Sequence, residues 1–295
     1  MSEKELPLKG SIIGFIGLGV MGLPMATHIL NKGYSLHVYN RSIEKTKSIT
    51  DKGAVCHTQI SELAKNCDII ITMVGLPSDV EEVYCGENGL LKHVKENSIL
   101  IDMTTSSPKL ATKISEKALT RNIYTLDAPV SGGDIGAKNA GLSIMVGGSK
   151  LVYDKILPLF ECMGKNIVYQ GKAGCGQHTK MANQIVVAGN MIGVCEALAY
   201  SIKAGLNPKT VLESIAKGAA SSWALSNLAP RILDNDFEAG FYVKHFIKDM
   251  RIALECAVEN KCETPGLKIV LEQYERLAQA GFENDGTQGL FKMYN

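Results

Sequence analysis

The glycine-rich segment near the start of the chain constrains the fold more than any other feature. Residues 12–41 read IIGFIGLGVMGLPMATHILNKGYSLHVYNR. An apolar run precedes the motif Gly17-x-Gly19-x-x-Gly22, and an amphipathic helical pattern and a second apolar run follow it. Strand, glycine turn, helix and strand in this order are typical of a βαβ unit that binds a dinucleotide. The pyrophosphate would lie on free N–H groups at the positive end of the helix.

Each glycine of this motif has its own expected role. Gly17 allows the tight turn, Gly19 lets the backbone approach a pyrophosphate, and Gly22 lets the helix pack closely on the strand. The residues between these glycines, Leu18, Val20 and Met21, belong to the same predicted cofactor-binding loop.

The end of the second apolar run bears on the choice of cofactor. NAD sites place an Asp or Glu about 20 residues past the glycines, where it binds the ribose 2′-OH. This chain has Asn40-Arg41-Ser42 there, with Lys45 just beyond. Residues 40–42 include no carboxylate to repel a 2′-phosphate, and the Arg41 guanidinium could pair with one. The alternative is an exposed arginine at a strand end. The residues favour NADP, and NAD stays possible.

Bulk composition excludes several classes of partner. The chain has 295 residues, enough for two domains, and a net charge of +1, which indicates neither nucleic acid nor an anionic membrane surface. Eight cysteines form no CxxC motif and no metal-like cluster with histidine, so free thiols in a reducing cytoplasm and no metal are expected. The N-terminal residues MSEKELPLKG are polar and do not resemble a signal peptide. The apolar segment 185–202 contains Asn190 and Glu196, which favours a buried helix over a membrane span.

The order of predicted elements indicates an α/β domain followed by an all-α domain. Alternating strands and helices predict a mostly parallel sheet covered by helices on both faces, with the ligand outside the carboxyl ends of the strands. The expected elements after the first unit are helix 43–52, strand 54–57, helix 60–65, strand 68–74, helix 78–84, strand 99–102, helix 108–119, strands 123–127 and 143–146, helix 149–163 and strand 166–169. Helical periodicity then predicts helices 177–204, 208–217, 222–234, 244–260 and 265–280. We assign residues 1–173 to a Rossmann-type domain and 174–295 to a helical domain that binds substrate and mediates dimerisation.

A glycine-rich segment follows the strand predicted at 123–127. Ser131, Gly132 and Gly133 offer a hydroxyl and a row of unobstructed backbone N–H groups, which suit a carboxylate. An ordinary glycine-rich turn is the alternative.

The start of the long predicted helix carries a second group of polar residues. Lys180, Asn183 and Gln184 are spaced i, i+3 and i+4, so they share one face in the first turns, at the expected cleft. A lysine near the positive end of a helix, in a partly dry cleft, should have a depressed pKa, which suits a general acid. A solvated surface lysine is the alternative.

Lys248 and Asp249 lie on the helix predicted at 244–260. Lys248 could reach the cleft and hold cofactor or substrate charge, or both residues could be surface charges. The residues alone leave these two interpretations open.

Six ordered motifs resemble the β-hydroxyacid dehydrogenase family, which includes 3-hydroxyisobutyrate dehydrogenase, tartronate semialdehyde reductase and the glyoxylate/succinic semialdehyde reductases. They are GFIGLGVMGLPMA, DMTTSSP, DAPVSGG, IMVGG, GCGQHTKMANQ and FIKDM, and the match runs from Ile12 to about Tyr294. The resemblance implies hydride transfer between a nicotinamide and a short hydroxy or oxo acid, in a homodimer or homotetramer.

The resemblance also implies roles for single residues. Lys180 would be the catalytic lysine, with Asn183 beside it, and Ser131, Gly132 and Gly133 would bind the substrate carboxylate. Thr105 and Lys248 would contact the nicotinamide end of the cofactor. The segment containing Met73, Val74, Leu76 and Pro77 would lie along the cofactor.

Departures from related families bear on the substrate. Decarboxylating 6-phosphogluconate dehydrogenases have a histidine and a glutamate three and seven residues after the lysine, where this chain has Asn183 and Val187. Imine reductases replace the lysine, which is intact here. Two alternatives remain: a sugar-acid or phosphosugar dehydrogenase, with Arg231, Lys244, His245 and Lys248 as the candidate cations, and a non-catalytic NADP-binding module.

Overall fold

The computed structural model describes residues 10–294 of the chain. The chain divides into two compact units, Met1–Lys180 and Met181–Asn295. The division falls inside the long helix α9 (Cys175–Lys203), beyond the boundary expected after residue 173. The beginning of α9, with Lys180, therefore belongs to the first unit.

Within the described residues, the first unit is built on one sheet of nine strands, in the order β3-β2-β1-β4-β5-β6-β8-β7, with β9 paired to β8. The strands are β1 (Ile12–Ile16), β2 (Ser35–Tyr39), β3 (Val55–Cys56), β4 (Ile69–Thr72), β5 (Ile99–Asp102), β6 (Tyr124–Asp127), β7 (Val130–Ser131), β8 (Leu142–Gly148) and β9 (Gly164–Gly171). All pairs from β3 to β6 are parallel, which confirms the predicted α/β architecture. The sheet is mostly parallel, as predicted, and the exception is β8, which runs antiparallel to β6 and β7.

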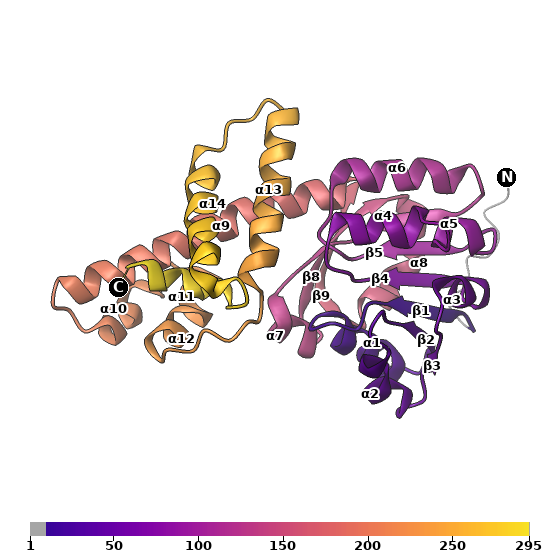
Figure 1. Ribbon diagram of the computed structural model, residues 1–295, viewed down its shortest axis with the longest axis horizontal. Helices are drawn as coiled ribbons and strands as arrows, with labels where there is room; N and C mark the ends of the chain where they lie inside the picture. Colours follow the sequence, from indigo (N-terminus) through magenta and orange to yellow (C-terminus); the bar gives the residue numbers. More distant parts are fainter. Residues whose placement is uncertain (1–9, 295) are drawn as a thin grey trace. The chain divides into compact units, whose positions relative to one another are not determined.

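Helices cover both faces of this sheet. They are α1 (Gly22–Asn31), α2 (Lys47–Thr50) after the 3₁₀ turn η1 (Ile43–Thr46), α3 (Ile60–Asn66), α4 (Pro77–Cys85), α5 (Leu90–His93), α6 (Pro108–Leu119), α7 (Gly133–Lys138) and α8 (Lys150–Phe160). Buried residues of α1, α2, α7 and α8 form one apolar cluster with the sheet, and those of α3, α4, α5 and α6 form another. Figure 1 shows α4 and α6 on one side of the strands and α1 and α2 on the other.

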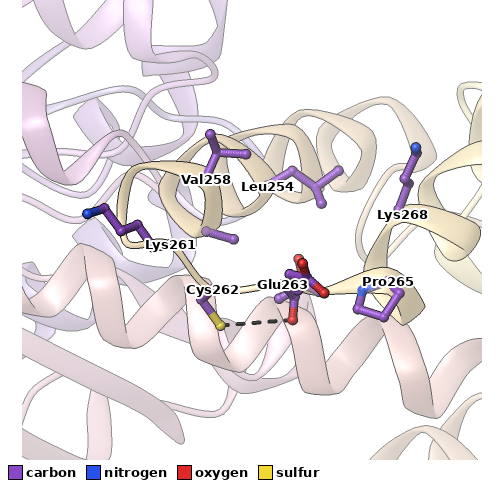
Figure 2. Close-up of a pocket in the computed structure, with 9 residues that line it drawn as sticks. Leu254, Val258, Lys261, Cys262, Glu263, Pro265 and Lys268 are labelled. Carbon is purple, nitrogen blue, oxygen red and sulfur yellow. Dashed lines mark hydrogen bonds between the residues drawn. The ribbon is translucent and has the colours of Figure 1, made fainter.

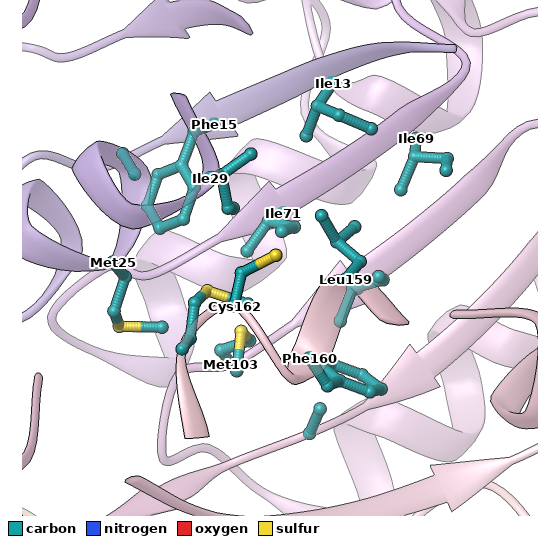
Figure 3. Packing of buried hydrophobic residues seen from close by; sticks show 14 of the residues in the cluster. Ile13, Phe15, Met25, Ile29, Ile69, Ile71, Met103, Leu159, Phe160 and Cys162 are labelled. Atoms are coloured by element: carbon teal, nitrogen blue, oxygen red, sulfur yellow. The ribbon is translucent and has the colours of Figure 1, made fainter. Parts of the chain in front are cut away.

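Alternate residues of the central strands serve these two clusters. In β1, Ile13 and Phe15 join the cluster beneath α1 and α8, whereas Ile16 joins the opposite one. Figure 3 shows Ile13 and Phe15 among Met25 of α1 and Phe160 of α8. Because both faces of the sheet are covered, the strands are continuous apolar runs in the sequence.

Two short helices lie where no helix was predicted. α5 spans four residues and buries Leu90 and Leu91, and α7 spans six residues and buries Ala137. Helices this short contain too few residues for a periodic pattern, and they are stabilised by packing rather than by propensity. The predicted glycine-rich turn at Ser131–Gly133 is therefore the junction between β7 and α7.

The second unit is helical. After Met181 in α9 it contains α10 (Pro208–Ile215), α11 (Trp223–Asn227), α12 (Ala229–Leu233), α13 (Val243–Glu259) and α14 (Pro265–Leu277), followed by the π-helical turn η2 (Ala278–Phe282) and the 3₁₀ helix η3 (Thr287–Tyr294). The single helix predicted at 222–234 is wrong: α11 ends at Asn227, and α12 begins with Pro230 in its first turn. Proline lacks the N–H that a continuous helix would need at that position.

α9 is long and apolar enough to cross a membrane when judged by length and composition alone. One side of it is buried in the core of the second unit, through residues that include Met181, Met191, Cys195 and Leu198. Only 33% of its most apolar window is buried, so the helix predicted to be buried is buried along one side and exposed along the other.

The turn between β1 and α1 leaves no room for side chains at two of its three glycines. Gly17 has a φ of +98°, and a Cβ atom there would overlap the carbonyl oxygen of Met73. A Cβ atom on Gly22 would overlap the carbonyl oxygen of Gly17. Gly19 is exposed, and a Cβ atom built there has no other atom within 4 Å. Gly17 and Gly22 are therefore required by packing, whereas Gly19 borders open space.

We predict that Gly22→Ala and Gly19→Ala separate folding from cofactor binding. Gly22→Ala should lower the free energy of unfolding by at least about 2 kcal/mol, because the added methyl group forces β1 and α1 apart. Gly19→Ala should unfold at the wild-type temperature but bind NADPH more weakly, because its methyl group fills the predicted pyrophosphate position. Thermal unfolding and NADPH fluorescence titration measure both effects. Wild-type affinity in Gly19→Ala would place the pyrophosphate elsewhere.

Candidate active site

The carboxyl ends of β1, β4, β5 and β6 lie side by side, because these strands are parallel neighbours in the sheet. The segments that follow these ends contain most of the predicted site residues of the first unit. They are the glycine loop after β1, the Met73–Pro77 segment after β4 and Thr105 after β5. This edge is where open parallel sheets bind their ligands.

Asn40 connects the glycine loop to the end of β2. Its Oδ1 accepts a hydrogen bond of 2.8 Å from the Leu18 backbone N–H, and its Nδ2 donates to the carbonyl oxygen of Ser42. A hollow of about 950 Å³ runs beside the loop and is lined by residues that include Leu18, Gly19 and Val20. Beyond the loop, this hollow extends along α1 and α2, past Thr27 and Lys47, and it does not include the Met73–Pro77 segment. The open space at Gly19 leaves room for a pyrophosphate.

Arg41 is solvent-exposed. Its side chain has 89% relative exposure, and Nη1 lies 3.9 Å from Oδ1 of Asp79 in the first turn of α4. The sequence interpretation found no carboxylate near the end of β2, and the structure corrects it, because Asp79 comes from a distant segment. Asp79 Oδ2 also accepts a hydrogen bond of 2.9 Å from the Leu76 N–H, which holds this carboxylate at the start of α4.

The segment after β4 is held by the segment after β5. The Val74 N–H donates to Thr104 Oγ1 over 3.0 Å, and the Thr104 N–H donates to Asp102 Oδ1. Leu76 is exposed, and Pro77 begins α4. Thr105 comes directly after Thr104 in the chain and is half-buried. These contacts set the backbone along which the cofactor is predicted to lie.

Two buried carboxylates end neighbouring strands. Asp102 of β5 and Asp127 of β6 are register partners, and burial raises the pKa of each from 3.8 to about 6. Asp102 also accepts from the Thr72 hydroxyl, whereas Asp127 accepts from backbone N–H groups of Gly174 and Gln177 at the start of α9. The sequence analysis assigned no role to either carboxylate. Their positions at the ends of apolar strands are the signal that could have found them.

Ser131, Gly132 and Gly133 form the junction between β7 and α7. Ser131 pairs with Ser143 of β8, and both glycines have positive φ, +129° at Gly132 and +60° at Gly133. All three residues are half-buried. A Cβ atom on Gly133 would meet nothing within 4 Å, so the backbone at Gly133 is approachable.

Lys180 lies in the second turn of α9 and is buried, with 6% relative exposure. This burial argues against the solvated surface lysine that the sequence left open. The start of α9 is bonded to β6 through Asp127 and to the segment after β5 through Gln177. Lys180 therefore follows, by less than one helical turn, a segment fixed to the carboxyl ends of the strands.

The remaining predicted residues form a chain of contacts inside the second unit. Asn183 Nδ2 donates to Gln184 Oε1 over 2.7 Å, and Gln184 Nε2 donates to Asp249 Oδ2. Asp249 Oδ1 lies 2.7 Å from Nζ of Lys248, whose side chain has 15% exposure. Asp249 is 2% exposed, so the interpretation of these two residues as surface charges is wrong. The sequence placed Gln184 on the right helical face but did not identify its partner, Asp249.

A further hollow of about 500 Å³ lies at the turn between α13 and α14 (Figure 2). Leu254, Val258, Cys262, Pro265 and Lys268 are among its lining residues. It includes none of the predicted site residues. In residues 10–294, no cluster of three or more histidine, cysteine or acidic side chains has the arrangement of a metal site.

Comparison with known proteins identifies the family. A family model described as the NAD-binding domain of 6-phosphogluconate dehydrogenase matches residues 12–171. A second model, described as NAD-binding of NADP-dependent 3-hydroxyisobutyrate dehydrogenase, matches residues 174–294. Together the two models span nearly the whole described chain.

Relatives and a solved structure agree with these models. The oxidoreductase YkwC of Bacillus subtilis is 58% identical over 96% of this chain and 98% of its own. The 2-hydroxy-3-oxopropionate reductase of Escherichia coli is 38% identical over 91% of this chain and 92% of its own. A structure of Mycobacterium tuberculosis 3-hydroxyisobutyrate dehydrogenase with L-serine is 26% identical, has a TM-score of 0.87 and covers 96% of this chain and 98% of its own. The chain thus belongs to the β-hydroxyacid dehydrogenase family, as an NAD(P)-dependent oxidoreductase of the 3-hydroxyisobutyrate dehydrogenase type.

Proposed function

We propose that this protein is an NADP-preferring reductase of a short 3- or 4-carbon oxo acid or semialdehyde, which in reverse oxidises the corresponding hydroxy acid. The observation that carries the proposal is the burial of Lys180 on α9, directly after a segment bonded to the carboxyl ends of β5 and β6. A lysine at this edge, next to a dinucleotide loop, suits proton transfer at a carbonyl.

Lys180 acts as the general acid of the reduction. A nicotinamide cofactor, when bound, would supply the hydride that the reduction needs. Lys180 Nζ donates the proton to the carbonyl oxygen as it becomes a hydroxyl. In the oxidation Lys180 accepts that proton, which requires the neutral amine. Desolvation of a buried lysine favours the neutral form. Such general acid catalysis contributes about 10²–10⁴-fold to the rate. Asn183 lies one turn later on the same helix and orients the same oxygen.

The substrate carboxylate binds at the β7–α7 junction. The Ser131 hydroxyl and the backbone N–H groups of Gly132 and Gly133 are half-buried donors. Both glycines have a positive φ, which glycine adopts without strain. Two relatives support a small acid substrate: one is named 2-hydroxy-3-oxopropionate reductase, and the structure of the other contains L-serine. Thr105 positions the nicotinamide end of the cofactor. We propose the same role for Lys248, which is ion-paired with Asp249.

A phosphosugar substrate fits the cations of the second unit less well. Arg231 donates to both carboxylate oxygens of Asp236, over 2.7 and 3.0 Å, and Lys244 donates to Asn284. Lys248 is paired with Asp249. A phosphate would have to compete with these internal partners for each of the three side chains.

We predict turnover in an assay of NADPH oxidation with glyoxylate, succinic semialdehyde, tartronate semialdehyde and methylmalonate semialdehyde. At least one should be reduced, and NADPH should give a higher kcat/KM than NADH. Competitive inhibition by inorganic phosphate, without turnover of any of the four acids, would favour the phosphosugar class instead.

Arg41→Ala serves as the control for cofactor choice. It should lower kcat/KM for NADPH by about tenfold or more and leave that for NADH nearly unchanged, because a charged hydrogen bond to the 2′-phosphate is lost. Equal effects on both cofactors would contradict the assignment of Arg41.

We predict that Lys180→Ala lowers kcat by at least about 100-fold and leaves the NADPH dissociation constant within about threefold of wild type, because a general acid contributes mainly to the chemical step. Lys203→Ala, an exposed lysine at the other end of α9, is the matched control and should keep wild-type turnover. A Lys180→Ala enzyme with more than about a tenth of the wild-type kcat would exclude the acid–base role.

The protein assembles in the cytoplasm as a homodimer or homotetramer. The exposed face of α9 carries Val186 and Tyr200, with exposures of 61% and 73%, and the open positions Gly189 and Gly193. Apolar and small residues along one helix face suit contact with a second chain.

Sedimentation at micromolar concentration should therefore give a mass of at least twice the 31.8 kDa of one chain. Val186→Lys should weaken the assembly. Leu119→Lys, at an equally exposed leucine of the first unit, should not change the mass. A monomeric wild-type protein would refute the assembly.

A further inference from the structure

The start of α9 receives its negative charge from a distant residue. The first turn of α9 contains no acidic residue, although the free N–H groups of a helix start attract an anion. Asp127, at the end of β6, provides it: Oδ1 accepts from the Gly174 N–H over 2.8 Å and Oδ2 from the Gln177 N–H over 2.9 Å. Burial raises the pKa of Asp127 to about 6, which is still below neutral pH, so the carboxylate is mostly ionised and both oxygens accept hydrogen bonds.

Gln177 makes a second connection from the same turn. Its side chain is fully buried, its Oε1 accepts from the Ser106 N–H over 2.9 Å, and its Nε2 donates to the Thr104 carbonyl oxygen over 2.7 Å. The first turn of α9 is thereby joined to the segment after β5 as well as to β6. That segment includes Thr105, which is predicted to contact the cofactor.

Two glycines bring the backbones themselves together. A Cβ atom on Gly176 would overlap the carbonyl oxygens of Asp127 and Met145, and a Cβ atom on Gly147 of β8 would lie 2.7 Å from the Gly176 nitrogen. The helix start therefore lies directly against β6 and β8, with no side chain between them. The hydrogen bonds of Asp127 and Gln177 therefore join backbone segments that are already in van der Waals contact.

We propose that Asp127 and Gln177 are positioning residues for catalysis, because they fix the first turn of α9 and thereby the location of Lys180 Nζ. This inference rests on the proposed role of Lys180 as general acid. Lys180 is three residues after Gln177, a rise of about 4.5 Å along the helix. A shift of the first turn by about 1 Å would move Lys180 by a similar amount, and displacements of that size can cost about 100-fold in rate.

Asp102 provides a matched control for Asp127. It is the register partner on β5, it is equally buried, and its pKa is also raised to about 6. Its hydrogen bonds come from Thr72 and Thr104 and not from α9. Asp102→Asn therefore removes a buried carboxylate and keeps both hydrogen bonds from the start of α9 to Asp127, and it reaches α9 only indirectly, through Thr104.

The experiment measures the single-turnover rate of NADPH oxidation with a substrate found in the panel, in Asp127→Asn, Gln177→Met and Asp102→Asn. We expect the rate to fall about ten- to hundredfold in the first two variants, with NADPH affinity within about threefold of wild type. Gln177→Met keeps the test decisive if Asp127→Asn does not fold. Each change is also combined with Lys180→Ala and assayed at micromolar enzyme, where residual rates are measurable.

The combined variants separate positioning from general damage. If Asp127 and Gln177 act through Lys180, Asp127→Asn and Gln177→Met should lower the single-turnover rate by less than about twofold in the Lys180→Ala background. Asp102→Asn should lower the rate by the same factor in both backgrounds. Wild-type rates in Asp127→Asn and Gln177→Met, or undiminished losses in the Lys180→Ala background, would overturn the inference. If Lys180→Ala alone stays active, the proposed function itself fails, and this result is distinct from either of those.

Discussion

The paired hydrogen bonds from the start of α9 to the Asp127 carboxylate are the contact on which the rest of the proposed site depends. A buried carboxylate is unfavourable unless donors surround it, and the raised pKa of Asp127 reflects that cost. Each hydrogen bond to a charged group contributes about 1.5–3 kcal/mol, so two backbone donors offset much of it. The helix gains an anion at its positive end, and the strand end gains a fixed neighbour.

Direct contact between backbone segments occurs at two places in the first unit, the β1–α1 turn and the start of α9. At the β1–α1 turn, Gly17 lies against Met73 and Gly22 lies against Gly17. At the start of α9, Gly176 lies against Asp127 and Met145. These glycines let a strand end and a helix start approach more closely than any side chain would permit. The first turns of α1 and α9 are therefore brought to the same edge of the sheet, where an anionic cofactor is expected. At α9 the N–H groups of Gly174 and Gln177 are already bonded to Asp127.

The second unit handles its charges differently. Its core is apolar, yet Gln184 and Asp249 are buried and bonded to each other, and Lys248 is paired to the same carboxylate. The ion pair fixes the position of the Lys248 ammonium group, and it weakens the positive electrostatic potential that this group presents to a ligand. The predicted contact of Lys248 with the nicotinamide end would thus depend on geometry more than on net charge, since Asp249 neutralises part of the lysine charge.

The sequence by itself determined the βαβ start, the succession of an α/β unit and a helical unit, and the family. Glycine spacing and hydrophobic periodicity act over a few residues, so they can be recognised without a fold. It also placed Lys180, Asn183 and Gln184 on one helical face, because that face follows from spacing alone. The short helices α5 and α7 were missed because they are stabilised by packing, which no local pattern records.

Only the tertiary structure decided which distant groups meet. Asp79 lies near Arg41, Asp127 caps α9 across about 50 residues of chain, and Asp249 is buried against Gln184 rather than exposed. Each of these contacts depends on strand order or on helix packing, and neither is encoded in the spacing of neighbouring residues. The sequence by itself determined the family and the spacing of the candidate site residues. The fold decided which carboxylates lie against them, because burial and hydrogen bonding join segments that are far apart in the chain.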